Sequence, residues 1–235
     1  MKPAFVAALL IALVAVEAGC TDNRATFFVR DIKVPTDECL LQSDRNAPYR
    51  SSGVLDLAIR DNYILTPLME NAMTSSTKLN PTSAESNRIQ VSGAQVRIGL
   101  EDGTDVSGGD FFINVSAMIE PGGVTSVGFT GIPSGYMAGV PAGSVVIVEF
   151  RMLGTTQGGK EVDTPWFAFP VTTCEGCLVF FSPESWDDVD DCYDCNSVGT
   201  GGDISQPCWI GQDELVDCRL CASINPGVCT DTSCP

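Results

Sequence analysis

The residues with the clearest chemical potential are the cysteines near the C-terminus, which fall into pairs separated by two residues. These pairs are Cys174 with Cys177, Cys192 with Cys195, and Cys218 with Cys221. Four thiolates at such a spacing can hold a tetrahedral zinc ion, as in a zinc ribbon. In an exported chain the same spacing favours disulfides, because exported compartments are oxidising. We therefore expect disulfides and keep zinc as the alternative.

An export signal is visible at the N-terminus. Lys2 precedes an apolar run that ends in Ala18-Gly19-Cys20. The run is shorter than the roughly 20 apolar residues that span a bilayer, so it predicts a signal peptide over residues 1–19. Cys20 would then be lipidated as the first residue of the mature chain. Glu17 stands where a lipoprotein signal usually has leucine, so cleavage by the ordinary secretory peptidase, with secretion, stays open.

Cysteine parity agrees with a lipidated Cys20. The chain holds 11 cysteines, and a lipid on one of them leaves ten that can pair completely. The expected disulfide residues are Cys39, Cys174, Cys177, Cys192, Cys195, Cys208, Cys218, Cys221, Cys229 and Cys234. Cys39 lies outside the tail, and we expect its partner to be Cys174 or Cys177, where the last body strand ends.

Charge and cysteine usage divide the chain into a body, residues 20–173, and an acidic tail, residues 174–235. The whole chain has a formal net charge of −17. The tail contains twelve acidic residues and a single base, Arg219. Nucleic-acid binding requires basic surface, so this charge argues against a nucleic-acid partner. It also argues against electrostatic adhesion to anionic lipids, so membrane attachment would come from the lipid anchor.

The chain has no histidine, which excludes Ser-His-Asp and Cys-His hydrolases and attachment of a c-type haem. Paired carboxylates or a Ser-Lys arrangement remain open, but no spacing singles them out. No Cys-x2-Cys pair is expected to begin a helix after a parallel strand, which argues against thioredoxin-like chemistry. We predict a protein that is not an enzyme and has no cofactor.

Residues 184–194 contain six carboxylates. Their oxygens would suit calcium, although the spacing matches no EF-hand loop, and a solvated charge run is the favoured interpretation. The weak calcium candidates are Asp187, Asp188, Asp190, Asp191 and Asp194. Trp186 and Tyr193 could contact a glycan or a protein partner, but packing against disulfides is the commoner role.

The body alternates apolar and polar residues with the period of β-strands. Strands are expected at Ala25–Val34, Val54–Leu65, Ile89–Leu100, Phe111–Ile119, Val124–Phe129, Val145–Leu153 and Pro165–Val171. A phase change predicts a bulge at Gly93, and the last two strands read as a hairpin. Thr66–Met73 is interpreted as a kinked edge strand. The predicted fold is an antiparallel immunoglobulin-like β-sandwich with a C-terminal disulfide-rich, loop-rich tail.

These features resemble a family of uncharacterised Cys-rich outer-membrane lipoproteins of myxobacteria and related diderm bacteria. The resemblance rests on Ala18-Gly19-Cys20, on Tyr63-Ile64-Leu65-Thr66-Pro67 followed by Asn71, on Asn87-Arg88-Ile89 leading into Gly93-Ala94-Gln95-Val96-Arg97-Ile98, and on Cys174-Glu175-Gly176-Cys177. It implies a lipoprotein in the outer membrane with a β-rich body, and it carries over no activity.

The sequence therefore predicts a non-enzymatic, lipid-anchored cell-envelope protein that serves as a structural or interaction module, with an envelope protein or a glycan as its partner. The alternative is an extracytoplasmic calcium- or glycan-binding protein.

Overall fold

The computed structural model describes residues 26–79, 84–187, 192–193, 195, 206–222 and 224–229. The described chain is mainly β, as the sequence predicts, and is built on two larger sheets with small two-stranded ladders beside them. Its helices are single turns: α2 (Ser76–Leu79), the 3-10 turn η1 (Pro183–Ser185), α3 (Cys218–Cys221) and α4 (Pro226–Cys229). Among the described residues, no helix has the length and apolar character needed to cross a bilayer.

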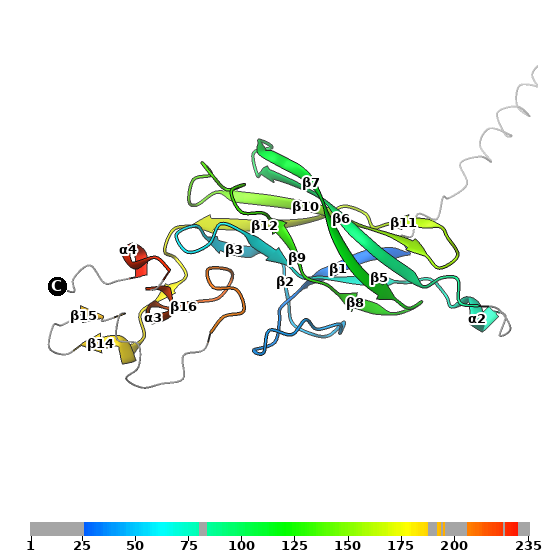
Figure 1. The fold of residues 1–235 in the computed structure, drawn as a ribbon, viewed down its shortest axis with the longest axis horizontal. Helices are drawn as coiled ribbons and strands as arrows, with labels where there is room; N and C mark the ends of the chain where they lie inside the picture. Colours follow the sequence, from blue (N-terminus) through cyan, green and yellow to red (C-terminus); the bar gives the residue numbers. More distant parts are fainter. Residues whose placement is uncertain are drawn as a thin grey trace, which may run out of the picture.

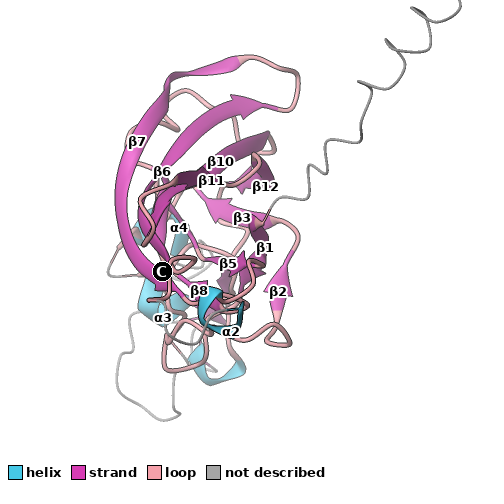
Figure 2. Cartoon of the chain, turned by 90° about the vertical axis from the view of Figure 1, so that its right-hand side faces the viewer, coloured by secondary structure: helices cyan, strands magenta, loops and turns pink. Residues whose placement is uncertain are grey.

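The larger sheet has the strand order β3-β12-β10-β6-β7, with β11 also paired to β10. Its strands are β3 (Gly53–Asp56), β6 (Ile89–Leu100), β7 (Asp105–Ile119), β10 (Val145–Thr156), β11 (Glu161–Asp163) and β12 (Phe167–Cys174). The β6–β7 hairpin curls around one side of the molecule in Figure 2. Pairing is antiparallel except between β12 and β3, which run parallel. The sheet is therefore mixed, and the expectation of a wholly antiparallel fold is wrong.

The second sheet has the order β2-β1-β5-β8. Its strands are β1 (Phe27–Lys33), β2 (Tyr49–Arg50), β5 (Pro67–Asn71) and β8 (Val124–Ser126). A separate ladder pairs β4 (Tyr63–Leu65) with β9 (Phe129–Ile132). Hydrophobic residues from both larger sheets and from this ladder form one core cluster. In β10 every second side chain is buried, because successive side chains of a strand point to opposite faces.

Two predicted features of the larger sheet are confirmed. The pairing of β6 with β7 shifts register between Val91 and Gly93, which is the predicted bulge. A side chain at Gly93 would collide with the Phe112 ring and the Ile113 carbonyl, so glycine is required there. β10 pairs antiparallel with β12, as expected for the predicted hairpin, although β10 continues to Thr156 and first turns back through β11.

Three strand predictions need correction. The stretch predicted as Val54–Leu65 is broken into β3 and β4, because the Asp56 carboxylate accepts a hydrogen bond from the Ala58 amide and turns the chain. The stretch Val124–Phe129 is divided between β8 and β9, which belong to different sheets.

The segment interpreted as a kinked edge strand lies inside its sheet as β5, between β1 and β8. Leu68 and Met69 have no exposed surface there. Pro67 is tolerated because it is the first residue of the strand, where a missing amide costs least.

The described part of the tail lies at one end of the molecule, beyond β3 and β12, and α2 lies at the other end (Figure 1). It contains two short ladders. β13 (Val179–Phe180) runs parallel to β16 (Val216–Asp217), and β14 (Trp186–Asp187) runs antiparallel to β15 (Cys192–Tyr193).

Candidate functional site

Four disulfides join described cysteines: Cys39–Cys208, Cys174–Cys177, Cys195–Cys218 and Cys221–Cys229. Disulfides are characteristic of exported proteins, so these bridges indicate an extracytoplasmic location. Because Cys195 is bonded to Cys218, the alternative of a zinc ribbon using Cys195 as a thiolate ligand is wrong. The side chain of Cys192 and the whole of Cys234 lie outside the described residues, so the predicted fifth bridge stays a prediction.

The expected partner of Cys39 is wrong. Cys174 and Cys177 bond to each other within the turn that leaves β12. Cys39 bonds instead to Cys208, which lies 169 positions further along the chain. The physical reason is that residues 206–214 return from the tail to the body. That return is a tertiary contact, and spacing between cysteines carries no signal for it.

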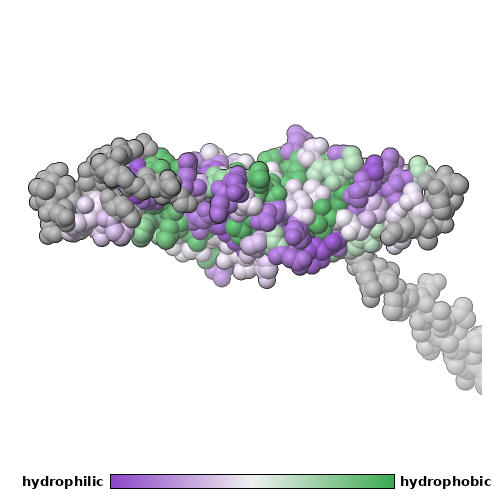
Figure 3. Space-filling model, turned by 90° about the horizontal axis from the view of Figure 1, so that it is seen from below, coloured by the Kyte–Doolittle hydropathy of each residue, from purple (hydrophilic) through white to green (hydrophobic). Residues whose placement is uncertain are grey.

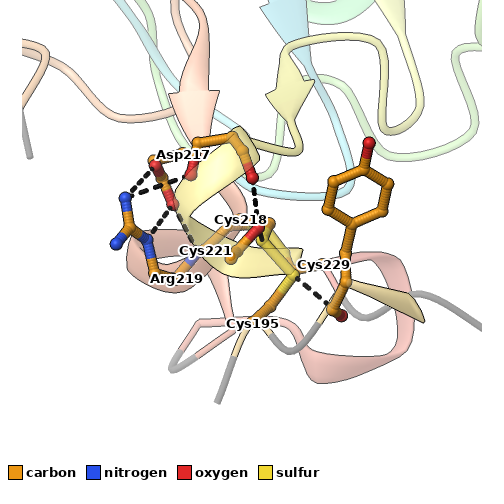
Figure 4. The surroundings of a disulfide bond; sticks show 9 residues. Cys195, Asp217, Cys218, Arg219, Cys221 and Cys229 are labelled. Atoms are coloured by element: carbon orange, nitrogen blue, oxygen red, sulfur yellow. Dashed lines mark hydrogen bonds and ion pairs between the residues drawn. A yellow bond between two sulfur atoms is a disulfide. The ribbon is translucent and has the colours of Figure 1, made fainter. Parts of the chain in front are cut away.

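The tail has a small core of its own, in which cysteines replace apolar side chains. Four bridged cysteines, Val216 and Ala222 form a buried cluster, and Tyr193 packs against it. Tyr193 therefore has the packing role that the sequence favoured. Figure 4 shows the Cys195–Cys218 bridge beside Asp217 and Arg219. The described part of the tail has few apolar side chains and is ordered around disulfides, as expected for a segment too small for an ordinary hydrophobic core.

Asp217 and Arg219 complete this cluster electrostatically. Arg219 is 7% exposed and donates from Nη2 to Asp217 Oδ2 over 2.7 Å and to Ser182 Oγ over 3.1 Å. Hydrogen bonding to the Arg219 guanidinium lowers the pKa of the Asp217 carboxyl. The Asp217 side chain also accepts from the Arg219 amide at the start of α3. The single base of the tail is therefore used to pair a partly buried acid.

Asp213 joins the returning segment to the body. Its carboxylate, 3% exposed, accepts from the Tyr63 hydroxyl over 2.7 Å and from the Val54 amide over 2.8 Å. It also forms an ion pair with Arg50 at 3.0 Å. Burial, together with the neighbouring carboxylate, raises the pKa of the Tyr63 phenol far above its usual range, so Tyr63 remains a donor. Gln212 adds two hydrogen bonds to the backbone of Ile64 in the body.

A pocket of about 720 Å³ lies where the larger sheet ends at the β6–β7 hairpin. Arg97 of β6 pairs with Asp110 of β7, whereas Gly99 pairs with Asp105. Only Ile98 of β6 therefore lies opposite residues 106–109 of β7, so β7 has a bulge at this position. A side chain at Gly109 would meet the carbonyl oxygens of Ile98 and Val106, so this bulge requires glycine.

The polar groups of this pocket are Arg97, Asp110 and Glu149. Arg97 lies 3.7 Å from Asp110, and their side chains are 50% and 78% exposed. The Arg97 guanidinium also lies 4.1 Å from the centre of the Trp166 ring, which Arg151 approaches to 5.1 Å. An arginine held by an aromatic ring is pre-organised for hydrogen bonding to a polar ligand.

Binding fits this pocket better than hydrolysis. A pair of carboxylates could cleave a glycosidic bond only if one of them stayed protonated, which requires an apolar setting. Asp110 is largely exposed and faces an arginine, so the pocket lacks the apolar setting that such a general acid requires. The arrangement can offer donors and acceptors to a polar ligand, and glycines 108 and 109 let such a ligand approach the backbone.

Several predicted site residues lie outside what is described. Cys20 is among them, and so are Asp188, Asp190, Asp191 and Asp194. The backbone of Asp187 belongs to β14, but its side chain is not described. Lipidation and the weak calcium site therefore stay predictions.

Sequence reasoning missed the pocket residues and the Asp213 contacts. Arg97 falls on the outward face of β6 once the bulge at Gly93 is counted, and Gly108-Gly109 interrupts a strand pattern. Those two signals together could have marked the hairpin end. Nothing in the sequence pairs Asp213 with Tyr63, 150 positions away.

Comparisons with known proteins leave the family unassigned. No protein-family model matches the chain, and no curated protein matches it.

Proposed function

We propose that the chain is a non-enzymatic, lipid-anchored protein of the outer membrane that serves as an interaction module of the cell envelope. The observation that carries this proposal is the Cys39–Cys208 bridge. This bridge joins the acidic tail to the β-rich body, and such disulfides form and persist in the oxidising compartments outside the cytoplasm. The sequence Ala18-Gly19-Cys20 supports the lipid anchor. The rival location is secretion without an anchor.

The body is proposed to be an immunoglobulin-like sandwich. In support, the two larger sheets share one core cluster. The larger sheet has the order β3-β12-β10-β6-β7. Its parallel pairing of β3, from early in the body, with β12, the last body strand, is compatible with such a sandwich. Such a body would hold the pocket end of the β6–β7 hairpin on a rigid support, which suits a protein that binds partners.

The anchor is tested by expressing the full chain in a diderm bacterium. We expect a mature protein that starts at Cys20, carries acyl chains by mass spectrometry and partitions into detergent. Cys20→Ala should leave uncleaved precursor, because the lipoprotein peptidase acts on the lipidated cysteine. Glu17→Leu is the matched control and should be processed at least as well as the natural chain. A mature N-terminus at Gly19, with the protein in the aqueous phase, would instead establish secretion.

A glycan-binding role is the second candidate, favoured by the arginine and the carboxylates of the pocket. Calorimetric titration of the full chain with a panel of acidic and neutral oligosaccharides should find one ligand class. Arg97→Ala should weaken that binding about tenfold, since a charged hydrogen bond contributes about 1.5 kcal/mol. Arg88→Ala removes an arginine that directly precedes β6, pairs with Glu120 and lies outside the pocket, so it should leave the affinity unchanged. Equal losses in both variants, or release of reducing sugar, would reject the role.

A further inference from the structure

The Cys174–Cys177 bridge is open to solvent, unlike the two bridges inside the tail core. Cys177 is exposed and Cys174 is half-buried. The cysteines of the Cys195–Cys218 and Cys221–Cys229 bridges are at most 1% exposed. Figure 3 shows hydrophilic and hydrophobic residues interspersed over the face of the molecule that is seen from below. Exchange of a disulfide requires an attacking thiolate to reach a sulfur, and only an accessible bridge permits that.

The turn that carries this bridge is held by Asp56, a carboxylate with no exposed surface. Asp56 lies opposite Cys174 in the parallel pairing of β3 with β12. It accepts hydrogen bonds from the amides of Gly176 at 2.7 Å, Leu178 at 3.0 Å and Ala58 at 3.1 Å. The shape of the turn therefore has a support that does not depend on the sulfur–sulfur bond.

The hydrogen bonds to Asp56 would hold Cys174 and Cys177 close together even after their disulfide is reduced. A carboxylate oxygen of Asp56 and both sulfurs lie within 4.8 Å of one another. When the bond between Cys174 and Cys177 is broken, the hydrogen bonds to Asp56 keep the two thiols close. Close thiols form a disulfide again readily, because the second step of exchange is then intramolecular. The pair can thus pass between its two redox states without rebuilding the turn.

We propose that Cys174 and Cys177 form an exchange-active disulfide that takes two electrons from a dithiol of another exported protein. This activity would replace the non-enzymatic part of the proposed function and leave the lipid anchor and the interaction role unchanged. A thiolate of that dithiol attacks the exposed sulfur of Cys177. The Cys174–Cys177 bond breaks, and Cys174 leaves as a thiolate that takes up a proton. The second thiolate of the partner then attacks the partner's first sulfur, which is bonded to Cys177 in the mixed disulfide. Cys177 is released as a thiol, the partner leaves as a disulfide, and this chain holds two thiols.

The expectation that no Cys-x2-Cys pair begins a helix after a parallel strand is wrong for Cys218 and Cys221, because α3 begins at Cys218 directly after β16, which is parallel to β13. The Cys174–Cys177 pair has a different setting, since β12 is parallel to β3 and ends at Cys174. The residues that follow form a turn and not a helix. The pair is therefore positioned by a buried carboxylate at a strand end, and a helix N-terminus has no part in it.

The first experiment measures which bridge of the folded full chain opens first. The protein is exposed to limiting dithiothreitol without denaturant, the new thiols are alkylated at successive times, and peptides are mapped by mass spectrometry. We expect Cys174 and Cys177 to be labelled at least about tenfold faster than the buried tail cysteines. The Cys39–Cys208 bridge, which also has an exposed cysteine, serves as the internal control and should open more slowly. Simultaneous labelling of all bridges would overturn the proposal.

The second experiment measures turnover. The probe is a dithiol peptide, and oxidised glutathione is the terminal oxidant, so each cycle oxidises one peptide and reduces one glutathione disulfide. The full chain should accelerate peptide oxidation over the uncatalysed rate, and Cys174→Ser/Cys177→Ser should abolish the acceleration while keeping its circular dichroism spectrum. Cys174→Ser alone leaves a thiol at Cys177, whose thiolate attacks the disulfide form of the probe and forms a mixed disulfide, with one probe sulfur leaving as a thiol. Equal rates for the natural chain and the folded double variant would show that the bridge is structural only.

Discussion

Asp213→Asn is expected to lower the free energy of unfolding by about 3 kcal/mol. Asparagine tolerates positive φ, so the φ of 64° at this position is not the cause. The loss follows because an amide offers one acceptor where the carboxylate offers two. The Tyr63 hydroxyl, the Val54 amide and the Arg50 guanidinium all rely on those oxygens. Buried donors left without partners keep their full cost of desolvation. Urea unfolding, followed by tryptophan fluorescence, measures the change.

The neighbouring residue provides the control. Glu214 also carries a carboxylate that faces Arg50, at 2.9 Å, but its side chain is 41% exposed. Glu214→Gln should therefore cost at most about 0.5 kcal/mol, since exposed ion pairs contribute little. If the two variants lost the same stability, Asp213 would be an ordinary surface charge and the junction between body and tail would lie elsewhere.

Removal of the Cys39–Cys208 bridge should have the largest effect of any disulfide variant. The bridge closes a loop with a sequence separation of 169. Chain entropy predicts that Cys39→Ser/Cys208→Ser destabilises the protein by about 5 kcal/mol, because the cross-link restricts the unfolded chain. Unfolding in urea, with the other bridges kept oxidised, gives the measurement.

The Cys174–Cys177 bridge is the matched comparison for this prediction. It also has an exposed cysteine, but its sequence separation is 3, so Cys174→Ser/Cys177→Ser should cost about 2 kcal/mol. The order of the two losses is the firm part of the expectation. A smaller loss for the long loop would mean that residues 206–214 stay docked through Asp213 and Gln212 without the bridge.

Much of the local structure could be predicted from the sequence. Alternation of apolar residues placed β1, β6, β7, β10 and β12 close to their observed positions, because side chains along a strand point alternately inward and outward. The bulge at Gly93 was visible as a change of phase. Prediction failed where a side chain ended a strand, as Asp56 does after β3, since capping by a carboxylate leaves no periodic trace.

The sequence by itself determined that the chain is rich in β-strands, that its acidic tail is built on cysteines, and that it has no histidine for catalysis. Those properties follow from composition and from short-range periodicity. Only the tertiary structure decided that Cys39 bonds to Cys208 and that Asp213 accepts a hydrogen bond from the Tyr63 hydroxyl. The same holds for Asp56, which supports the turn of Cys174 and Cys177. Each joins positions more than 100 residues apart. Such contacts are fixed by how the sheets pack and the chain returns, and local sequence does not encode the partner.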